Sequence, residues 1–202
     1  MPVVELKFPL QGAVIPADHG YFLYAALSRV LPVLHQWQDI SICGISGVTD
    51  TTRNLHLQAN SKLRLRIDAE KVGSLFPLAG KSLKIAQANI RLGIPKTQLL
   101  KPHSNLYSRL VLIKMQRDLT PSNFLDSLHK QLQALGIHNR AILFDDHKQG
   151  FVRKTIYLKG KQLVGYPVLL TGLSPQESLL LQEKGIGGKR KMGCGSFVGV
   201  RG

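Results

Sequence analysis

The sequence predicts an α+β protein built from two tandem βαββαβ domains. Two observations lead to this fold class. Segments with the alternation typical of half-buried strands recur along the chain, and segments with helical periodicity or helix caps stand between them. The second half of the chain repeats the element order of the first half. A length of 202 residues suits two small domains.

In the first half, Lys62–Ile67 reads Lys-Leu-Arg-Leu-Arg-Ile, which puts apolar side chains on one face of a strand and basic ones on the other. Asp18 is the expected cap of the first helix. The expected elements are strands over Val3–Leu10, Ile40–Ile45, Lys62–Ile67 and Ser82–Leu92, a helix over Gly20–Leu34 and a short helical stretch over Ala69–Leu78.

In the second half, Thr120-Pro121 opens a helix that runs to about Leu135, and Ser174-Pro175-Gln176-Glu177 is a capping box for a helix that stops at Gly185. A turn is expected at Asp145-Asp146-His147. The expected strands are Ser108–Met115, Ala141–Phe144, the hairpin of Lys154–Leu158 with Gln162–Leu170, and a final apolar strand after the C-terminal loop.

Gly93-Ile94-Pro95 interrupts the periodic segments between the two halves. The expected organisation is an N-terminal domain over residues 1–95, a linker over 96–105 and a C-terminal domain over 106–202. Each domain has the order of the ferredoxin-like (RRM-like) fold, an antiparallel sheet with two helices on one face. One face of each sheet is then available to a ligand.

Composition indicates a nucleic-acid partner. The chain has 27 Lys and Arg against 12 Asp and Glu, a net charge of +15, yet 44% of its residues are hydrophobic. This is a folded protein whose field attracts polyanions. Because there is no long apolar run and no signal-peptide pattern, we expect a cytoplasmic protein without a membrane partner. Two cysteines without CxxC spacing argue against a zinc site.

The segment Gly185–Phe197 places five glycines and the consecutive cations Lys189, Arg190 and Lys191 before the final strand. Glycine permits positive φ and close approach of another chain to backbone N–H groups, and the cations match phosphate. The segment therefore predicts a cradle for a polyanion, with a flexible solvated hairpin as the alternative.

On the first helix, Tyr21, Tyr24, Ser28 and His35 fall along one line, separate from the apolar face. Pro32 disturbs this line because it removes the hydrogen bond to the Ser28 carbonyl, so the helix can end near Leu31 and restart. His35 is then beside the stripe, either as a functional group or as an ordinary cap or surface histidine.

These motifs resemble those of a known family. The order Asp18-His19-Gly20-Tyr21-Phe22-Leu23-Tyr24, then Leu34-His35, with a closing Gly-Ile-Gly-x-x-Arg-x-x-Gly-Cys-Gly loop, resembles the CRISPR-associated repeat-processing endoribonucleases, the sixth Cas protein. The similarity is closest to the subgroup with a GIGG(K/R)(R/K)xMGCGxF ending, and it extends over essentially the whole chain.

The resemblance implies cleavage of precursor CRISPR RNA in the repeat, without a metal ion or any other cofactor. A 2′-hydroxyl attacks the adjacent phosphorus, which leaves 2′,3′-cyclic phosphate and 5′-hydroxyl ends. The implied partners are the precursor and the mature crRNA and, as in some family members, other Cas proteins of an interference complex. The alternative function is a non-catalytic RNA-binding subunit of a CRISPR ribonucleoprotein.

The resemblance also implies the catalytic residues. His35 is the first choice for the catalytic histidine and His19 the second, because the positive end of the helix dipole disfavours an imidazolium at His19. Ser28, where the family's helper tyrosine falls, or the neighbouring Tyr24 orients the base or the attacking hydroxyl. Arg190 is the expected stabiliser of the phosphorane.

RNA binding is expected from two further groups of residues. In the loop, Gly187, Gly188, Lys189, Arg190 and Lys191 hold phosphates, with simple solvation of the lysines as the alternative. Elsewhere, Arg64 and Arg66 share the exposed face of one strand, and Arg153, Lys154, Lys159 and Lys161 flank the second-domain hairpin. Such hairpins can lie against an RNA stem and read shape and phosphates. A scattered positive surface is the alternative.

Other chemistries fit less well. Asp145-Asp146-His147 lacks further carboxylates for a metal site, and no metal is expected. The glycine loop is neither a P-loop nor a dinucleotide fingerprint. His56, His103, His129 and His138 have no motif around them and are assigned to the surface.

Overall fold

The computed structural model describes residues 1–115, 118–146, 150–158 and 160–200. The chain divides into two compact units, Met1–Leu99 (unit 1) and Leu100–Gly202 (unit 2). Residues 96–99, which the sequence analysis assigned to a linker, belong to unit 1 as a strand. Each unit is described by itself.

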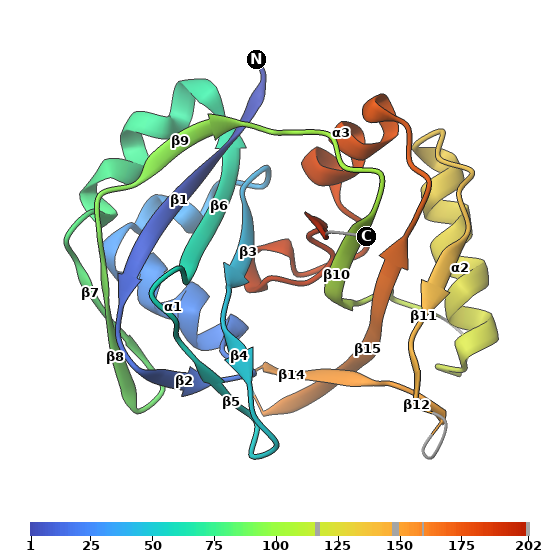
Figure 1. Ribbon diagram of the computed structural model, residues 1–202, viewed down its shortest axis with the longest axis horizontal. Coiled ribbons are helices and arrows are strands. Elements are labelled where there is room, and N and C mark those ends of the chain that lie inside the picture. The colour runs from blue at the N-terminus through green and yellow to red at the C-terminus, as the bar shows by residue number, and fades with distance from the viewer. Residues whose placement is uncertain (116–117, 147–149, 159, 201–202) are drawn as a thin grey trace. The chain divides into compact units, whose positions relative to one another are not determined.

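Unit 1 contains a six-stranded sheet with the order β3-β6-β1-β8-β7, and β9 pairs with β1 (Figure 1). Its elements are β1 (Val3–Gln11), β2 (Val14–Pro16), α1 (Gly20–Val30), η1 (Pro32–His35), β3 (Ser41–Ile45), β4 (Val48–Thr49), β5 (Asn54–His56), β6 (Lys62–Asp68), η2 (Ala69–Leu78), β7 (Ser82–Ile85), β8 (Ala88–Leu92) and β9 (Lys96–Leu99).

The order β8-β1-β6-β3 is that of a ferredoxin-like sheet, because the first strand lies centrally between the third and the last. Alternation along β1 directs Val4, Leu6 and Phe8 into the core, where the apolar residues of α1 and η2 pack against them. The opposite face of β1 carries Glu5 and Lys7.

Three details of unit 1 differ from the sequence prediction. Helix α1 ends at Val30 and its N-cap is His19, not Asp18. The strand predicted over residues 82–92 is a hairpin, in which β7 and β8 join through a two-residue turn at Ala86 and Gln87. The short strands β2, β5 and β4 form a separate small sheet that no pattern predicted.

Unit 2 repeats the topology, with the order β11-β15-β10-β16 and β14 paired to β15 (Figure 1). Its elements are β10 (Leu106–Val111), α2 (Pro121–Ala134), β11 (Ala141–Leu143), β12 (Asp145–Asp146), β13 (Gly150–Phe151), β14 (Lys154–Leu158), β15 (Lys161–Leu170), α3 (Pro175–Lys184), η3 (Arg190–Met192) and β16 (Val198–Gly199). The predicted fold class, two tandem ferredoxin-like domains, is confirmed.

Both helix caps predicted in unit 2 are present. The Thr120 side chain accepts a hydrogen bond from the Asn123 amide at the start of α2. At the start of α3, Ser174 and Glu177 form both hydrogen bonds of the capping box. Hydrogen bonding of the Glu177 carboxylate to the Ser174 side chain, and then to the Ser174 backbone, holds the pKa of Glu177 below its ordinary value. Helix α3 ends at Gly185, whose φ is 63°.

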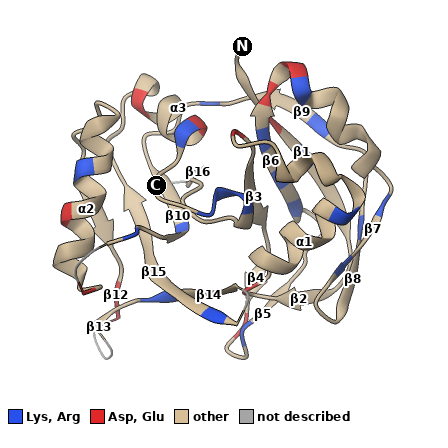
Figure 2. Ribbon diagram, turned by 180° about the vertical axis from the view of Figure 1, so that it is seen from behind, with Lys and Arg blue, Asp and Glu red and all other residues tan. Residues whose placement is uncertain are grey.

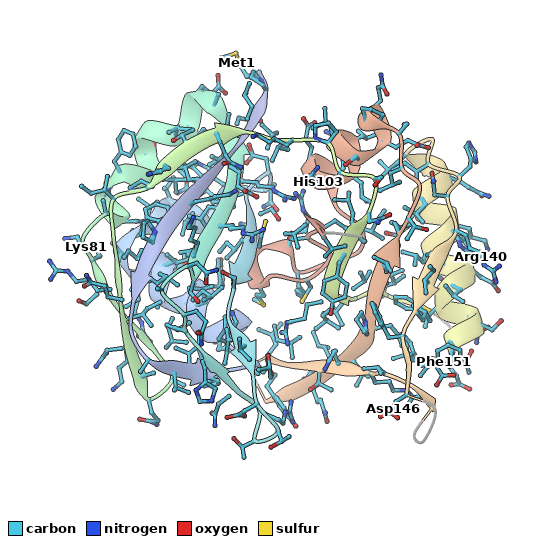
Figure 3. All side chains as sticks on the ribbon, viewed as in Figure 1. Met1, Lys81, His103, Arg140, Asp146 and Phe151 are labelled. Atoms are coloured by element: carbon cyan, nitrogen blue, oxygen red, sulfur yellow. The ribbon has the colours of Figure 1, made fainter. Side chains whose placement is uncertain are left out.

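The sequence predicted a turn at Asp145-Asp146-His147, but the described part of this segment is a strand. Asp145 and Asp146 form strand β12 and pair with Phe151 and Gly150 of β13. Figure 3 labels Asp146 and Phe151 on these neighbouring strands. His147 lies outside the described residues.

Two features are absent from the described residues. No helix there is long and apolar enough to cross a membrane. No group of three or more His, Cys, Asp or Glu side chains in the same residues is placed to hold a metal ion.

Candidate active site

The Tyr24 hydroxyl and His35 Nδ1 lie 2.8 Å apart and share a hydrogen bond. The two rings also pack edge to face, with centroids 5.6 Å apart and an interplanar angle of 84°. The imidazole is exposed and the tyrosine is half-buried. Two of the residues on the predicted stripe are therefore in direct contact, and the hydroxyl fixes the orientation of an imidazole at the surface.

Pro32 is the local cause of this arrangement. Proline lacks the N–H that would continue α1, so the helix ends at Val30 and the chain restarts as the single turn η1, with proline at its start. Leu34 anchors that turn in the core because its side chain is fully buried. The next residue, His35, then projects from the surface, off the strict line of the helix.

His19 has a different environment. It is buried, with its Nδ1 3.0 Å from the Pro16 carbonyl oxygen and its Nε2 3.3 Å from the Ile45 amide nitrogen. A carbonyl only accepts and an amide N–H only donates, so the ring is neutral with its proton on Nδ1. Both ring nitrogens hold the chain together around α1, which argues against His19 as the catalytic base.

Ser28 does not join the tyrosine and the histidine. Its side chain is buried, and no residue of the described chain forms a hydrogen bond with its hydroxyl oxygen. Of the two candidates to orient the base, Tyr24 is the one that contacts His35.

The C-terminal loop of unit 2 is packed tightly onto β10. A Cβ on Gly195 would lie 1.8 Å from the Ile186 carbonyl oxygen, and one on Gly187 would lie 2.2 Å from the Leu112 carbonyl oxygen. Both glycines also have positive φ. Glycine is required at these positions because the backbone of the loop passes directly against other backbone.

The predicted cradle of available amides is not formed at Gly187 and Gly188. The Gly187 N–H donates to the Gln131 side chain at 3.0 Å, and the Gly188 N–H donates to the Leu112 carbonyl at 2.9 Å. These two N–H groups fasten the loop and are not available to a phosphate, and RNA contact by other atoms of Gly187 and Gly188 stays a prediction. Gly188 itself is exposed, with open space around its α-carbon.

The three cations of the loop differ in their surroundings. Lys189 is exposed and has a left-handed backbone with φ of 64°, whereas Arg190 and Lys191 are partly buried in η3. The guanidinium of Arg190 donates to the Glu183 carbonyl at 2.5 Å, at the last turn of α3. This contact places a cation at the negative end of the helix and determines where the guanidinium lies.

Arg64 and Arg66 do not share an exposed face as predicted. Arg66 is 2% exposed, and its Nε lies 3.1 Å from a carboxylate oxygen of Glu5, which is also buried. Arg64 is half-buried. The buried ion pair removes Arg66 from the set of candidate RNA-binding residues, because a guanidinium committed to Glu5 inside the protein does not contact a ligand.

A row of three cations crosses the sheet of unit 1. Strand register places Lys7 directly opposite both Arg64 on β6 and Lys96 on β9, so the three side chains project from the same face. The sequence analysis missed Lys7 and Lys96 because register between strands far apart in sequence is not visible in a one-dimensional pattern. Glu5 lies 3.3 Å from the Lys7 ammonium.

The hairpin of unit 2 carries its cations as predicted. Arg153, Lys154 and Lys161 are exposed at or beside β14 and β15. Lys159 lies outside the described residues. Among the histidines assigned to the surface, His103 and His138 are exposed, whereas His56 and His129 are half-buried.

Comparison with known proteins confirms the family resemblance. The family model described as Cas6 Crispr matches residues 4–202. A protein of Myxococcus xanthus (strain DK1622) named CRISPR-associated endonuclease Cas6 is 40% identical over 198 residues, which cover 98% of this chain and 82% of that protein.

Solved structures share the fold at low sequence identity. The structure described as a Cas6-related gene from Pyrococcus furiosus has a TM-score of 0.66 and 16% identity, covering 97% of this chain and 98% of that one. A structure described as a RAMP protein binding different RNA substrates has a TM-score of 0.67 and 13% identity, and the match covers 96% of this chain and 98% of that one. The family model and the relative from Myxococcus xanthus together show that this chain belongs to the Cas6 family.

Proposed function

We propose that this chain is a metal-independent endoribonuclease that cleaves precursor CRISPR RNA in the repeat. The observation that carries the proposal is the hydrogen bond between Tyr24 and the exposed His35, in a chain 40% identical to a protein named CRISPR-associated endonuclease Cas6. An imidazole held at the surface by a phenol is equipped for proton transfer near neutral pH.

His35 acts as the general base through Nε2. When Nδ1–H donates to the Tyr24 oxygen, the lone pair of the neutral ring is on Nε2, which accepts the proton of the attacking 2′-hydroxyl. The 2′-oxygen then attacks the adjacent phosphorus, the bond from phosphorus to the 5′-oxygen breaks, and the 5′-oxygen takes up a proton from solvent. The products are a 2′,3′-cyclic phosphate and a 5′-hydroxyl end.

Tyr24 is a positioning residue in this mechanism. Its hydroxyl fixes the direction in which Nε2 points. The burial of His19 and Ser28 supports this assignment, because neither reaches a substrate without a rearrangement of the core.

The cations of the C-terminal loop contribute charge. Lys189, which is the exposed cation of the three, binds a phosphate of the RNA, and Lys191 binds another. Arg190 stabilises the negative charge of the phosphorane, and the Glu183 carbonyl orients its guanidinium.

The remainder of the RNA is bound by the row Lys96, Lys7 and Arg64 in unit 1 and by Arg153, Lys154 and Lys161 in unit 2. Like charges directly opposite one another on neighbouring strands are unfavourable. Glu5 offsets part of this repulsion at Lys7, and an RNA phosphate that lies across the row offsets more of it. The partners are the precursor RNA, its mature product and other Cas proteins of an interference complex.

The proposal is tested with a repeat RNA in the presence of EDTA and a second RNA that lacks the 2′-hydroxyl beside the scissile phosphate. Cleavage of the first RNA alone, with binding of both, is the expected result. His35→Ala should abolish cleavage and leave affinity for the uncleavable RNA nearly unchanged. Binding without cleavage of either RNA would instead identify a non-catalytic RNA-binding subunit.

A further inference from the structure

We infer that unit 1 has a second RNA contact away from His35, a subsite for one nucleotide of single-stranded RNA between α1 and the β7–β8 hairpin. The inference rests on the proposed function, since RNA is the ligand. A cavity of about 360 Å³ lies here, within the size range of small-ligand sites. Its lining consists of Phe22, Ala25, Arg29, Lys84, Ala86 and Gln87.

One face of α1 carries the side chains that contact the nucleotide in this proposal. Phe22, Ala25 and Arg29 are separated by three and four residues, so they lie on the same side of α1. At about 100° per residue this side is turned roughly 130° from Tyr24. The cavity is therefore distinct from the site around His35, although both use α1.

Phe22 supplies a stacking surface at the protein exterior. Its side chain is 42% exposed, so the ring is accessible to solvent. Aromatic rings exposed beside cations are the feature with which proteins bind single-stranded nucleic acid, because every base has a face that stacks. Ala25 leaves the space above the helix open, since a larger side chain there would fill the cavity.

Arg29 and Lys84 supply the charge for a phosphate. Both are exposed cations that line the cavity, one on α1 and one on β7. A helical side chain extends toward the N-terminus of its helix, so the Arg29 guanidinium reaches back toward Phe22. Figure 2 shows Lys and Arg positions on α1 and on the adjoining β7 and β8. A base on Phe22 and its phosphate between the two cations fit this arrangement.

The β7–β8 hairpin turn supplies another part of the lining. Ala86 lines the cavity with φ of 54°, a left-handed conformation that favours glycine over alanine. A two-residue hairpin turn requires such a conformation at a central position. Both residues of the turn, Ala86 and Gln87, line the cavity.

Binding measurements with an uncleavable repeat RNA test the inference. Phe22→Ala should weaken binding about fivefold or more, the loss expected for one stacked base. Ala25→Leu should weaken binding to a similar extent by filling the cavity without altering charge. Arg29→Ala should reduce the slope of log affinity against log salt by about 0.7, the value for one phosphate of a single strand.

The matched control is Lys81→Ala, which removes an exposed lysine next to β7 that does not line the cavity; Figure 3 labels it at the surface. Photo-crosslinking with 5-iodouridine at successive positions of the RNA should give an adduct at Phe22 for one position. Unchanged affinity in both the Phe22 and the Ala25 variants, with no adduct at Phe22, overturns the subsite. Cleavage by the wild-type protein is measured separately, so failure of the proposed function can be distinguished from failure of the subsite.

Discussion

Replacing Arg66 by alanine should destabilise unit 1 without acting directly on RNA binding. Removing one partner of a buried ion pair typically costs about 3–5 kcal/mol because the other charge stays buried. Lys7 already lies 3.3 Å from the other carboxylate oxygen of Glu5 and will neutralise part of its charge. We therefore expect a loss near the lower limit, about 3 kcal/mol, measured by urea denaturation.

Arg64→Ala is the matched control, since it removes the same side chain two residues away on the same strand. This variant should lose less than about 1 kcal/mol of unfolding free energy and should bind RNA less tightly. A double variant, Glu5→Leu with Arg66→Met, should recover most of the stability lost by Arg66→Ala. The reasoning fails if Arg66→Ala unfolds like the wild type and instead loses RNA affinity as Arg64→Ala does.

Three further predictions concern the site, the loop and a helix cap. Tyr24→Phe should slow single-turnover cleavage about 10- to 100-fold and leave affinity unchanged, because His35 loses its orientation; unaltered cleavage excludes the positioning role. Gly195→Ala should destabilise unit 2 by about 2–3 kcal/mol, whereas Gly188→Ala should stay within about 0.5 kcal/mol, both measured by denaturation. The pKa of Glu177 is lowered in the folded state, so its contribution is present at neutral pH and is lost as pH falls through the folded-state pKa. Glu177→Gln should therefore cost less than about 1 kcal/mol at pH 7, and this difference should vanish in acid.

Local signals predicted most of the fold. Caps and proline positions located α2 and α3 because those features act within one turn of helix. Alternating and apolar segments found strands β1, β3 and β6 of unit 1 and the four strands of the unit 2 sheet. The prediction of one strand over residues 82–92 was wrong because its turn contains Ala86 and Gln87, which carry none of the usual glycine or asparagine signals.

The candidate site was less accessible to sequence reasoning. The pairing of Tyr24 with His35 could be anticipated from helical spacing, because both lie on or beside one short helix. The burial of Arg66 could not, because its partner Glu5 is 61 residues away and the alternation of β6 made both arginines look equivalent. The internal use of the loop amides likewise depends on β10 and α2, which the loop sequence does not encode.

The break at Pro32 separates the histidine from the register of α1. His35 is held next to the buried Leu34 and by a hydrogen bond with the Tyr24 phenol, and not by its angular position on a continuous helix. If α1 became longer or shorter by a residue, the imidazole would not have to rotate with it around the helix axis. The spacing between tyrosine and histidine is thus open to change among related sequences while the contact between them is kept, and matching such sequences by position alone would pair the wrong residues.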